Sequence, residues 1–401
     1  MPLTLQSVGP FEIPSDLTYV GLLFALFVVP KAFQRYRIPS AITSLGLGAA
    51  AGASGFVGPT DTVQLLATFG IVALFLFAGL EIDGGELRRD AHVLIQYGVI
   101  WLALVVGTTY AASRVLELGL RPSALLALAV LTPSTGFILS SLEGFGLHAD
   151  EAAVVKRKAI TAELLSLTAL FVTLQSMSVG HMVIATGALL AIVIFIPVAF
   201  RLFATAVAPY APRSEFAFLL MVAVVCAHAT HSLGVYYLVG AFLVGVAAQR
   251  FRSQLPAMSS QKMVDALEAF GSVFIPFYFF QAGLRLDPVV LRWPSIVCGV
   301  VLLAVFVPLR ILVMLAHRGW WLGELQGKAR RVGLAMVPTL VFSLVLADML
   351  RTTFDVPPFL VGGIVFYAVV NTTLPAFSLR SAPPEFERVG VAEVEARASA
   401  A

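Results

Sequence analysis

The amino-acid sequence predicts an all-α polytopic membrane protein with about 13 transmembrane helices. Composition is the first reason. Of the 401 residues, 59% are hydrophobic and 12% are charged, whereas a soluble globular chain carries about 25% charged residues. The second reason is that apolar runs close to 20 residues long, the length needed to cross a bilayer, recur along the whole chain. The third is the uneven placement of lysine and arginine between these runs.

The apolar runs define the helices and the domain boundaries. Residues 1–16 are expected to form an extracytoplasmic tail, residues 17–378 the transmembrane domain, and residues 379–401 a short cytoplasmic tail. The helices are expected near residues 17–33, 41–57, 63–80, 92–115, 122–142, 156–178, 181–205, 214–232, 234–249, 264–284, 290–316, 330–350 and 358–378. An odd number of helices places the two termini on opposite sides of the membrane.

The basic residues set the orientation of these helices. With the N-terminus outside, most of the 26 lysine and arginine residues fall at the cytoplasmic ends of helices, as the positive-inside rule requires. No lysine or arginine precedes the first apolar run, which argues against a cleaved signal peptide. We therefore expect a multi-pass protein of the plasma (bacterial inner) membrane, with the N-terminus outside and the C-terminus in the cytoplasm.

A short internal echo indicates two inverted repeats. Residues 77–83 (Phe-Ala-Gly-Leu-Glu-Ile-Asp) close the third run, and residues 281–287 (Gln-Ala-Gly-Leu-Arg-Leu-Asp) close the tenth. In the predicted topology these copies end on opposite sides of the membrane, which is the arrangement of many transporters. Repeat one then covers about 17–178 and repeat two about 214–378, with residues 181–205 as a linker helix.

Helices 5 and 12, which occupy matching places in the two repeats, are both interrupted. Residues 131–136 (Leu-Thr-Pro-Ser-Thr-Gly) and 336–339 (Met-Val-Pro-Thr) place a proline among small polar residues. Proline removes a backbone donor and clashes with the preceding turn. Unwound backbone at membrane depth is tolerated where it lines a cavity, and there its oxygens can hold cations. The sequence therefore predicts a cation site with oxygen ligands drawn from Thr132, Ser134, Thr135 and Thr339; two simple kinks are the alternative.

Glu163 is the most informative single residue. It lies within an apolar run that begins after Lys158, and an ionisable side chain in such a run costs on the order of several kcal/mol, which makes it a candidate functional residue. The residues three and four positions away carry no cation. Its charge must therefore be neutralised by another helix, by a bound ion or by a proton.

Arg310 is the second charge inside a predicted helix. Counted along their helices, Arg310 and Glu163 lie at similar depths from the cytoplasmic side, at about 1.5 Å per residue. Because arginine does not lose its proton in a protein, Arg310 is expected to balance Glu163 or the dipoles of the broken helices. A static buried Glu163–Arg310 ion pair that only joins two helices is the alternative.

Other charged and small residues have less specific patterns. Glu268 is a reserve candidate for a second carboxylate, and Asp348 and Arg351 are expected to form a surface pair of little energetic weight. Gly46, Gly48, Ala50 and Gly52 make one small-residue surface, suited to close helix packing or to a dimer.

Several functions find no support in the sequence. It contains no phosphate-binding glycine loop, metalloprotease helix or nucleophile elbow, so we expect a protein that is not an enzyme and uses no cofactor. Its basic residues follow the cytoplasmic membrane face, so no nucleic-acid partner is expected. The two cysteines, Cys226 and Cys298, both lie in apolar runs and indicate neither a disulfide framework nor a zinc site.

Three motifs together resemble the monovalent cation/proton antiporter family, close to bacterial sodium/proton and glutathione-gated potassium/proton antiporters. They are residues 74–77 followed by Gly-Leu-Glu-Ile-Asp at 79–83, the Thr-Pro-Ser-Thr break, and residues 277–284 (Phe-Tyr-Phe-Phe-Gln-Ala-Gly-Leu). The resemblance spans roughly 17–378. It implies 13 helices with crossed, broken helices 5 and 12, a homodimer built by one domain, and an elevator-like movement of the other.

The resemblance also implies roles for the two buried charges. The family's essential carboxylate, usually the second residue of an Asp-Asp or Asn-Asp pair, matches Glu163, and the first position of that pair matches Ala162. The family's basic residue two helices before the end matches Arg310. Since neither Ala162 nor Arg310 titrates, we expect electroneutral, one-for-one exchange of Na⁺ or K⁺ for H⁺ by alternating access at Glu163. A sodium-coupled symporter of an organic anion and a cation channel are the alternatives.

Overall fold

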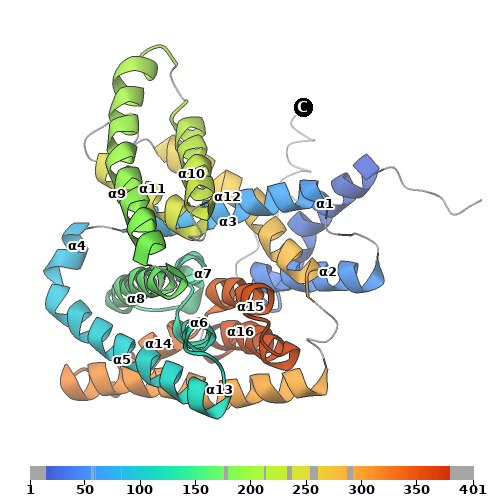
Figure 1. The fold of residues 1–401 in the computed structure, drawn as a ribbon, viewed down its shortest axis with the longest axis vertical. Helices are drawn as coiled ribbons and strands as arrows, with labels where there is room; N and C mark the ends of the chain where they lie inside the picture. The colour runs from blue at the N-terminus through green and yellow to red at the C-terminus, as the bar shows by residue number, and fades with distance from the viewer. Residues whose placement is uncertain are drawn as a thin grey trace, which may run out of the picture.

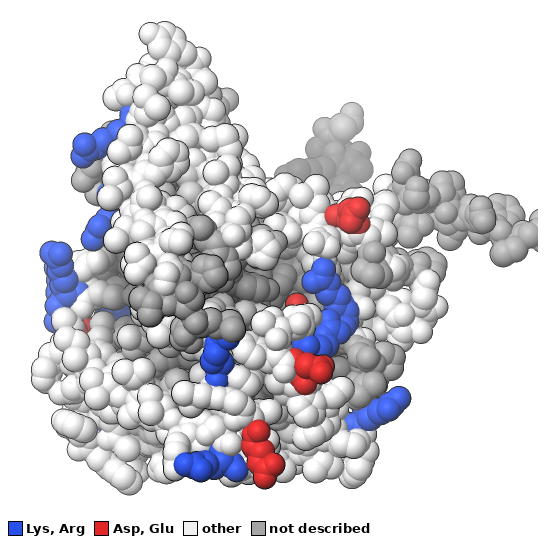
Figure 2. All heavy atoms as spheres, in the orientation of Figure 1, with Lys and Arg blue, Asp and Glu red and all other residues white. Residues whose placement is uncertain are grey.

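The computed structural model describes residues 15–55, 58, 60–82, 84–175, 179–211, 214–232, 237–252, 261–286 and 292–379. Within these ranges every regular element is a helix, so the all-α class is confirmed. On the face drawn in Figure 2, lysine, arginine, aspartate and glutamate make up a small part of the described surface.

The predicted apolar runs correspond to helices throughout the described ranges. The long elements are α1 Ser15–Gln34, α2 Ser40–Ser54, α3 Asp61–Leu80, α5 Ala91–Val115, α6 Leu120–Leu131, α7 Thr135–Ser141, α8 Ala149–Gln175, α9 Val179–Leu202, α10 Glu215–Ser232, α11 Tyr237–Arg252, α12 Gln261–Leu284, α13 Trp293–Leu315, α14 Gln326–Ala335, α15 Leu340–Phe354 and α16 Pro358–Ser378. The shorter ones are α4 Gly84–Arg89, η1 Glu143–Phe145, and the π-helical segments η2 Phe203–Val207 and η5 Ala316–Trp321.

The number of membrane crossings remains a prediction. By length and composition, nine helices of the described ranges can cross a membrane, or ten if α14 and α15 count as one bent span. The described apolar parts of α1 and α11 are shorter than a full crossing.

The helices pack as two groups, which Figure 1 shows one above the other. In the upper group, called here the α3–α12 group, α3 contacts α11 and α12, α2 contacts α12, and α10 contacts α11. In the lower group, the α6–α15 group, α6 contacts α5 and α15, and α16 contacts α13 and α15. In addition, α9 contacts α11 of the upper group, and α8 contacts α5, α6 and α7 in the lower group. Contacts of α7 with α3 and of α8 with α9 join the two groups.

Glycine explains the echo between the third and tenth runs. A Cβ on Gly79 of α3 would lie 2.3 Å from the Phe242 carbonyl oxygen of α11, and a Cβ on Gly283 of α12 would lie 2.1 Å from the Leu45 carbonyl oxygen of α2. Both motif glycines therefore allow two helix backbones to meet, in pairs that the inverted repeat makes equivalent. The repeat itself stays a prediction.

The small-residue surface of α2 is used for packing within the chain. A Cβ on Gly48 would lie 2.0 Å from the Phe280 carbonyl oxygen, and a Cβ on Gly52 would lie 3.1 Å from the Leu284 carbonyl oxygen, both on α12. Gly46 faces open space. Close helix packing is therefore confirmed for Gly48 and Gly52, while a dimer contact stays a prediction.

Two helix interruptions lie at the predicted places and touch each other. The chain leaves helical geometry between α6 and α7 at residues 132–134, here called break one, and between α14 and α15 at residues 336–339, here called break two. The axes of α14 and α15 differ by 46°. The backbone N–H of Ser134 donates a 2.8 Å hydrogen bond to the carbonyl of Pro338. Ser343 Oγ of α15 lies 2.7 Å from the Ala129 carbonyl of α6, so the two broken segments are held together at the breaks and in the helical turns beside them.

Candidate ion-binding site

Glu163 is buried in the middle of α8, with 2% of its surface exposed. Its Oε2 atom has no hydrogen-bond partner among the described residues. The ion pairs formed by the described residues involve other acids: Glu81, Asp90, Asp150, Glu151, Glu324 and Asp348. Burying a carboxylate without a partner is costly, so this group needs a proton or a cation.

Two further buried oxygens belong to the last residue of break one and the first residue of α7. Ser134 and Thr135 are 2% and 1% exposed, and neither hydroxyl has a hydrogen-bond partner among the described residues. Thr135 is the side chain that interacts with the carboxyl of Glu163. Carboxylate and hydroxyl oxygens are hard ligands that suit hard cations. The structure therefore places the hydroxyl of Thr135 beside the carboxyl of Glu163, with the buried hydroxyl of Ser134 one residue away along the chain.

Thr132, also in break one, is engaged with α8. Its Oγ1 lies 2.8 Å from Ser166 Oγ, and Ser166 donates its own proton to the Ala162 carbonyl at 2.7 Å. A serine hydroxyl has one proton, so Thr132 is the donor to Ser166. This bond ties break one to the helix of Glu163 one turn beyond the carboxylate.

Arg310 does not pair with Glu163. Its guanidinium donates to the carbonyl of Val337 at 2.6 Å and to the carbonyl of Met336, and Nη1 lies 3.5 Å from the hydroxyl of Tyr367. Both carbonyls follow α14, whose last carbonyl groups have no intrahelical partner and form the negative end of the helix dipole. Of the two roles predicted for Arg310, the geometry shows balance of a broken helix; the static Glu163–Arg310 ion pair is not formed.

Thr339 belongs to a second polar network at break two. Its backbone N–H donates to Asn371 Oδ1 at 3.3 Å, and its Oγ1 accepts from Asn371 Nδ2 at 2.9 Å. Ser343 Oγ lies 2.7 Å from the same Thr339 oxygen. Sequence reasoning missed Asn371, Ser343 and Tyr367, although Asn371 opens a short polar stretch, Asn-Thr-Thr, inside the last apolar run.

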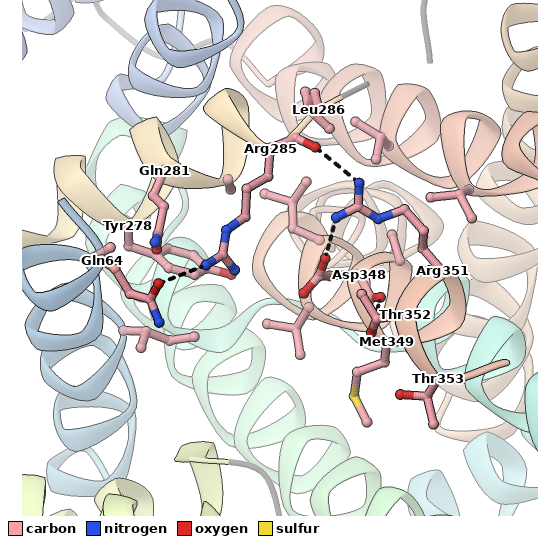
Figure 3. A pocket seen from close by; sticks show the side chains of 18 of the residues that line it. Gln64, Tyr278, Gln281, Arg285, Leu286, Asp348, Met349, Arg351, Thr352 and Thr353 are labelled. Atoms are coloured by element: carbon pink, nitrogen blue, oxygen red, sulfur yellow. Dashed lines mark hydrogen bonds and ion pairs between the residues drawn. The ribbon is translucent and has the colours of Figure 1, made fainter. Parts of the chain in front are cut away.

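A cavity of about 640 Å³ opens between the two helix groups (Figure 3). Its polar lining comes from helix ends that the topology predicts to lie outside, including Gln64 of α3, Arg285 beyond α12, and Asp348 and Arg351 of α15. Arg285 Nη2 lies 3.3 Å from Gln64 Oε1, and Arg351 bonds both Asp348 at 3.0 Å and the Arg285 carbonyl at 3.3 Å. The predicted Asp348–Arg351 pair is confirmed.

Aromatic packing lies beyond the floor of this cavity. Ile71 of α3 and Leu344 of α15 line it. One turn further along α3 is Phe75, which meets Phe342 of α15 with ring centroids 6.3 Å apart, and both rings are 1% exposed. A closed apolar contact therefore follows the cavity along the two helices toward the breaks.

The boundary between the α3–α12 group and the α6–α15 group is closed at the end opposite the cavity. A Cβ on Gly136 of α7 would meet Leu74 of α3 at 3.0 Å, and Lys156 of α8 forms an ion pair with Glu81 after α3. Lys156 and Glu81 lie at helix ends that are predicted to face the inside, whereas Gly136 and Leu74 lie within their helices. The reserve candidate Glu268 is exposed on α12.

A polytopic helical membrane protein with paired broken helices and a buried carboxyl belongs to the class of secondary transporters rather than enzymes. The family model described as "Sodium/hydrogen exchanger, transmembrane" matches residues 22–380. The chain belongs to this sodium/hydrogen exchanger family, which confirms the resemblance to monovalent cation/proton antiporters.

Individual relatives are more distant. The chain is 25% identical over 291 residues to the Na⁺/H⁺ antiporter NhaS5 of Synechocystis sp., covering 69% of this chain and 40% of that protein. It is 24% identical over 281 residues to the probable Na⁺/H⁺ antiporter 3 of Methanocaldococcus jannaschii, covering 66% of this chain and 70% of that protein. The fold is similar to the sodium proton antiporter MjNhaP1 of the same archaeon at pH 8, with a TM-score of 0.65 and 13% identity over 91% of this chain and 96% of that one.

Proposed function

We propose that this protein exchanges Na⁺ or K⁺ for H⁺ across the membrane by alternating access, with Glu163 as the shared site. One observation carries the proposal: the buried carboxyl of Glu163, which forms no ion pair among the described residues, lies beside the buried hydroxyl of Thr135 at a helix break. Such a group is neutral when it holds a proton. Deprotonated, it needs a cation in its place.

The neighbouring residues fit the two occupied states. Protonated Glu163 crosses without charge, and deprotonated Glu163 crosses with one monovalent cation that Ser134 and Thr135 help to bind. Arg310 keeps its charge and its carbonyl partners in both states. The two states therefore carry the same charge, and exchange is one-for-one and electroneutral. Thr132 and Thr339, whose hydroxyls are bonded to neighbours, hold the two breaks in place.

Movement between the helix groups provides access to the site. The cavity lined by Arg285 and Asp348 forms the outer half of the path, and the contact of Phe75 with Phe342 closes it. Sliding of the α6–α15 group along the α3–α12 group would separate these rings and break the Lys156–Glu81 contact at the other end. In this proposal the α3–α12 group stays fixed and forms the homodimer.

The test is transport in proteoliposomes loaded with a pH-sensitive dye. Adding Na⁺, K⁺ or Li⁺ outside should move protons out of the lumen, and the order of the three rates identifies the ion. A collapsed membrane potential should leave the rate unchanged, since exchange is electroneutral. A sustained current on solid-supported membranes under a cation gradient would contradict the one-for-one ratio.

A second candidate is sodium-coupled uptake of an organic anion. The outer cavity favours it, because about 640 Å³ is far more space than an alkali ion needs and Arg121, Arg285 and Arg351 line it. Arg310, however, is occupied by the carbonyls of break two and does not offer its guanidinium to a substrate. Sodium-dependent uptake of a labelled carboxylate without proton movement would favour this candidate over exchange.

A further inference from the structure

The outer cavity has a positively charged lining, although the substrate proposed above is a cation. Among the described residues that line it, Arg121 of α6, Arg285 beyond α12 and Arg351 of α15 are cations, and Asp348 is the one acid. A hollow lined by one sign of charge concentrates ions of the opposite sign and repels ions of its own sign. This lining therefore suits an anion better than it suits the ion that is to be exchanged.

The three arginines gather around the end of α15. Arg351 Nη1 donates a 3.3 Å hydrogen bond to the carbonyl of Arg285, which holds the chain after α12 against α15. The guanidinium carbon of Arg121 lies 5.2 Å from the centre of the Phe354 ring, and Phe354 follows Arg351 by three residues on α15. Figure 3 shows the side chains of Arg285 and Arg351 reaching from different helices to the same cavity. The positive groups therefore form one cluster.

The guanidinium groups of this cluster are only partly engaged. Each has five N–H donors. Among the described residues, Arg285 donates to the neutral amide of Gln64 at 3.3 Å and forms no ion pair. Arg351 donates to Asp348 and to one carbonyl, and Arg121 donates to two carbonyls at the end of α8. Guanidinium donors of this kind bind the oxygens of phosphate groups in pairs.

The size and charge of the cavity indicate the class of anion. Three arginines less one aspartate leave two positive charges in the described lining, and a phosphate monoester carries about two negative charges at neutral pH. A volume of about 640 Å³ has room for the phosphate and for part of the group that bears it. Gln281, Thr352 and Thr353 also line the cavity and supply neutral hydrogen-bonding groups.

We propose that the outer cavity is a binding site for a phosphate dianion, either free or as the phosphate monoester of a lipid headgroup, which slows exchange. Arg285 follows α12 of the α3–α12 group, whereas Arg121 and Arg351 belong to the α6–α15 group. The anion bridges the two groups and fits only the arrangement in which these arginines face one cavity. A ligand that binds one of two conformations shifts the population toward that conformation. This inference rests on the proposed exchange function and adds an inhibitory anion site to it.

Binding is tested without transport, by the thermal unfolding midpoint in detergent. Inorganic phosphate and, separately, a short-chain phosphatidic acid are added above neutral pH, with chloride at equal ionic strength as the reference. The midpoint of the wild type should rise with concentration. Arg285→Gln loses a charged donor and should need at least about tenfold more of the anion, whereas Asp348→Asn loses a repelling charge and should need about fivefold less. Arg114→Gln, a change of an exposed arginine on α5 outside the cavity, is the matched control and should respond like the wild type.

The inhibitory effect and the source of the anion are tested in proteoliposomes. Slower exchange when phosphate is added on the predicted outer side of phosphatidylcholine vesicles would identify a free anion as the ligand. Slowing that needs phosphatidic acid in the vesicles would identify a lipid headgroup.

Three results would overturn the site: a midpoint that responds to neither probe, a response that is the same in Arg285→Gln and the wild type, or sodium-driven accumulation of labelled phosphate inside the vesicles. Failure of the Glu163 proposal would instead appear as exchange retained by Glu163→Gln, a variant whose midpoint should still rise with phosphate.

Discussion

The two breaks look alike in the sequence but differ in how their polar groups are satisfied. At break two, Arg310 covers the carbonyls of Met336 and Val337, and Asn371 bonds both polar groups of Thr339. At break one and the first residue of α7, the hydroxyls of Ser134 and Thr135 are buried and meet hydrogen-bond geometry with none of the described residues. Buried polar groups are normally hydrogen-bonded, and exceptions need an explanation. The difference supports the proposal that the ion binds at break one, with break two as its support.

The largest effect is expected for Glu163→Gln, which tests whether the proposed ion binding at break one depends on the carboxyl of Glu163. Glu163→Gln keeps the size of the side chain but removes the exchangeable proton and the negative charge. Cation-driven proton movement in proteoliposomes should therefore fall to the level of empty vesicles. Glu268→Gln, a change of the exposed acid on α12, is the control and should keep the wild-type rate. Exchange that persists in Glu163→Gln moves the site elsewhere.

Arg310 tests whether break two is held by its guanidinium. A hydrogen bond to a charged group contributes about 1.5–3 kcal/mol, and Arg310→Met leaves two carbonyls without that donor. We expect a loss of about 2–4 kcal/mol in the free energy of unfolding, measured as a lower thermal unfolding midpoint in detergent. Arg310→Lys should lose less, since an ammonium can still bond one carbonyl.

The control for this prediction is Arg351→Met, at the exposed Asp348–Arg351 pair. Exposed ion pairs contribute about 0.2–1 kcal/mol, so its unfolding midpoint should barely move. Equal shifts for Arg310→Met and Arg351→Met would mean that the carbonyl contacts do not support break two.

Paired hydroxyl removals compare the breaks directly. Ser134→Ala and Thr135→Val remove oxygens that bond no described residue, so stability should change little. The KM for the cation should rise about fivefold to tenfold for each, corresponding to a lost ligand of about 1–1.4 kcal/mol. Thr339→Val should have the opposite pattern of effects. Its unfolding midpoint should fall, because Asn371 loses a hydrogen-bond partner, while its KM for the cation should stay within about twofold of the wild-type value. The interpretation fails if Thr339→Val raises the KM and Ser134→Ala does not.

The smallest effect is expected at the closed end of the group boundary. The side chains of Lys156 and Glu81 are 30% and 47% exposed, so their ion pair should contribute at most about 1 kcal/mol. Glu81→Gln should leave the unfolding midpoint nearly unchanged and shift exchange rates modestly. A large loss of activity would show that this contact, rather than the packing of α7 on α3, closes that end.

The sequence predicted the helical class, the positions of the helices and both breaks, because length, hydropathy and proline act locally. It also singled out Glu163 as an acid without a charged neighbour on its own helix, since a lone acid in an apolar run is visible without a structure; its role in transport stays a prediction. The partner of Arg310 could not be chosen in advance, because a carboxylate on α8 and carbonyls on α14 are both plausible acceptors at similar depth. Only the packing of α13 against α14 decides between them.

The burial of Lys158 was hidden for a related reason. Three cations in a row, Lys156, Arg157 and Lys158, read as one basic helix end. The helical turn separates them: Lys156 and Arg157 reach Glu81 and Asp90, whereas Lys158 points into the protein toward His317. The rotation of a helix relative to its neighbours is set by tertiary packing and cannot be read from the order of residues along the chain.

Competition between the proton and the cation tests the central claim most directly. Initial rates of cation-driven proton movement should be measured at a series of cation concentrations and pH values on the same side of the membrane. If both ligands share Glu163, the KM for the cation should rise with proton concentration, by about tenfold per pH unit once protons occupy the site, while the rate at saturating cation on that side is unaffected by this competition. A KM that stays constant across the pH series would contradict a shared site at Glu163.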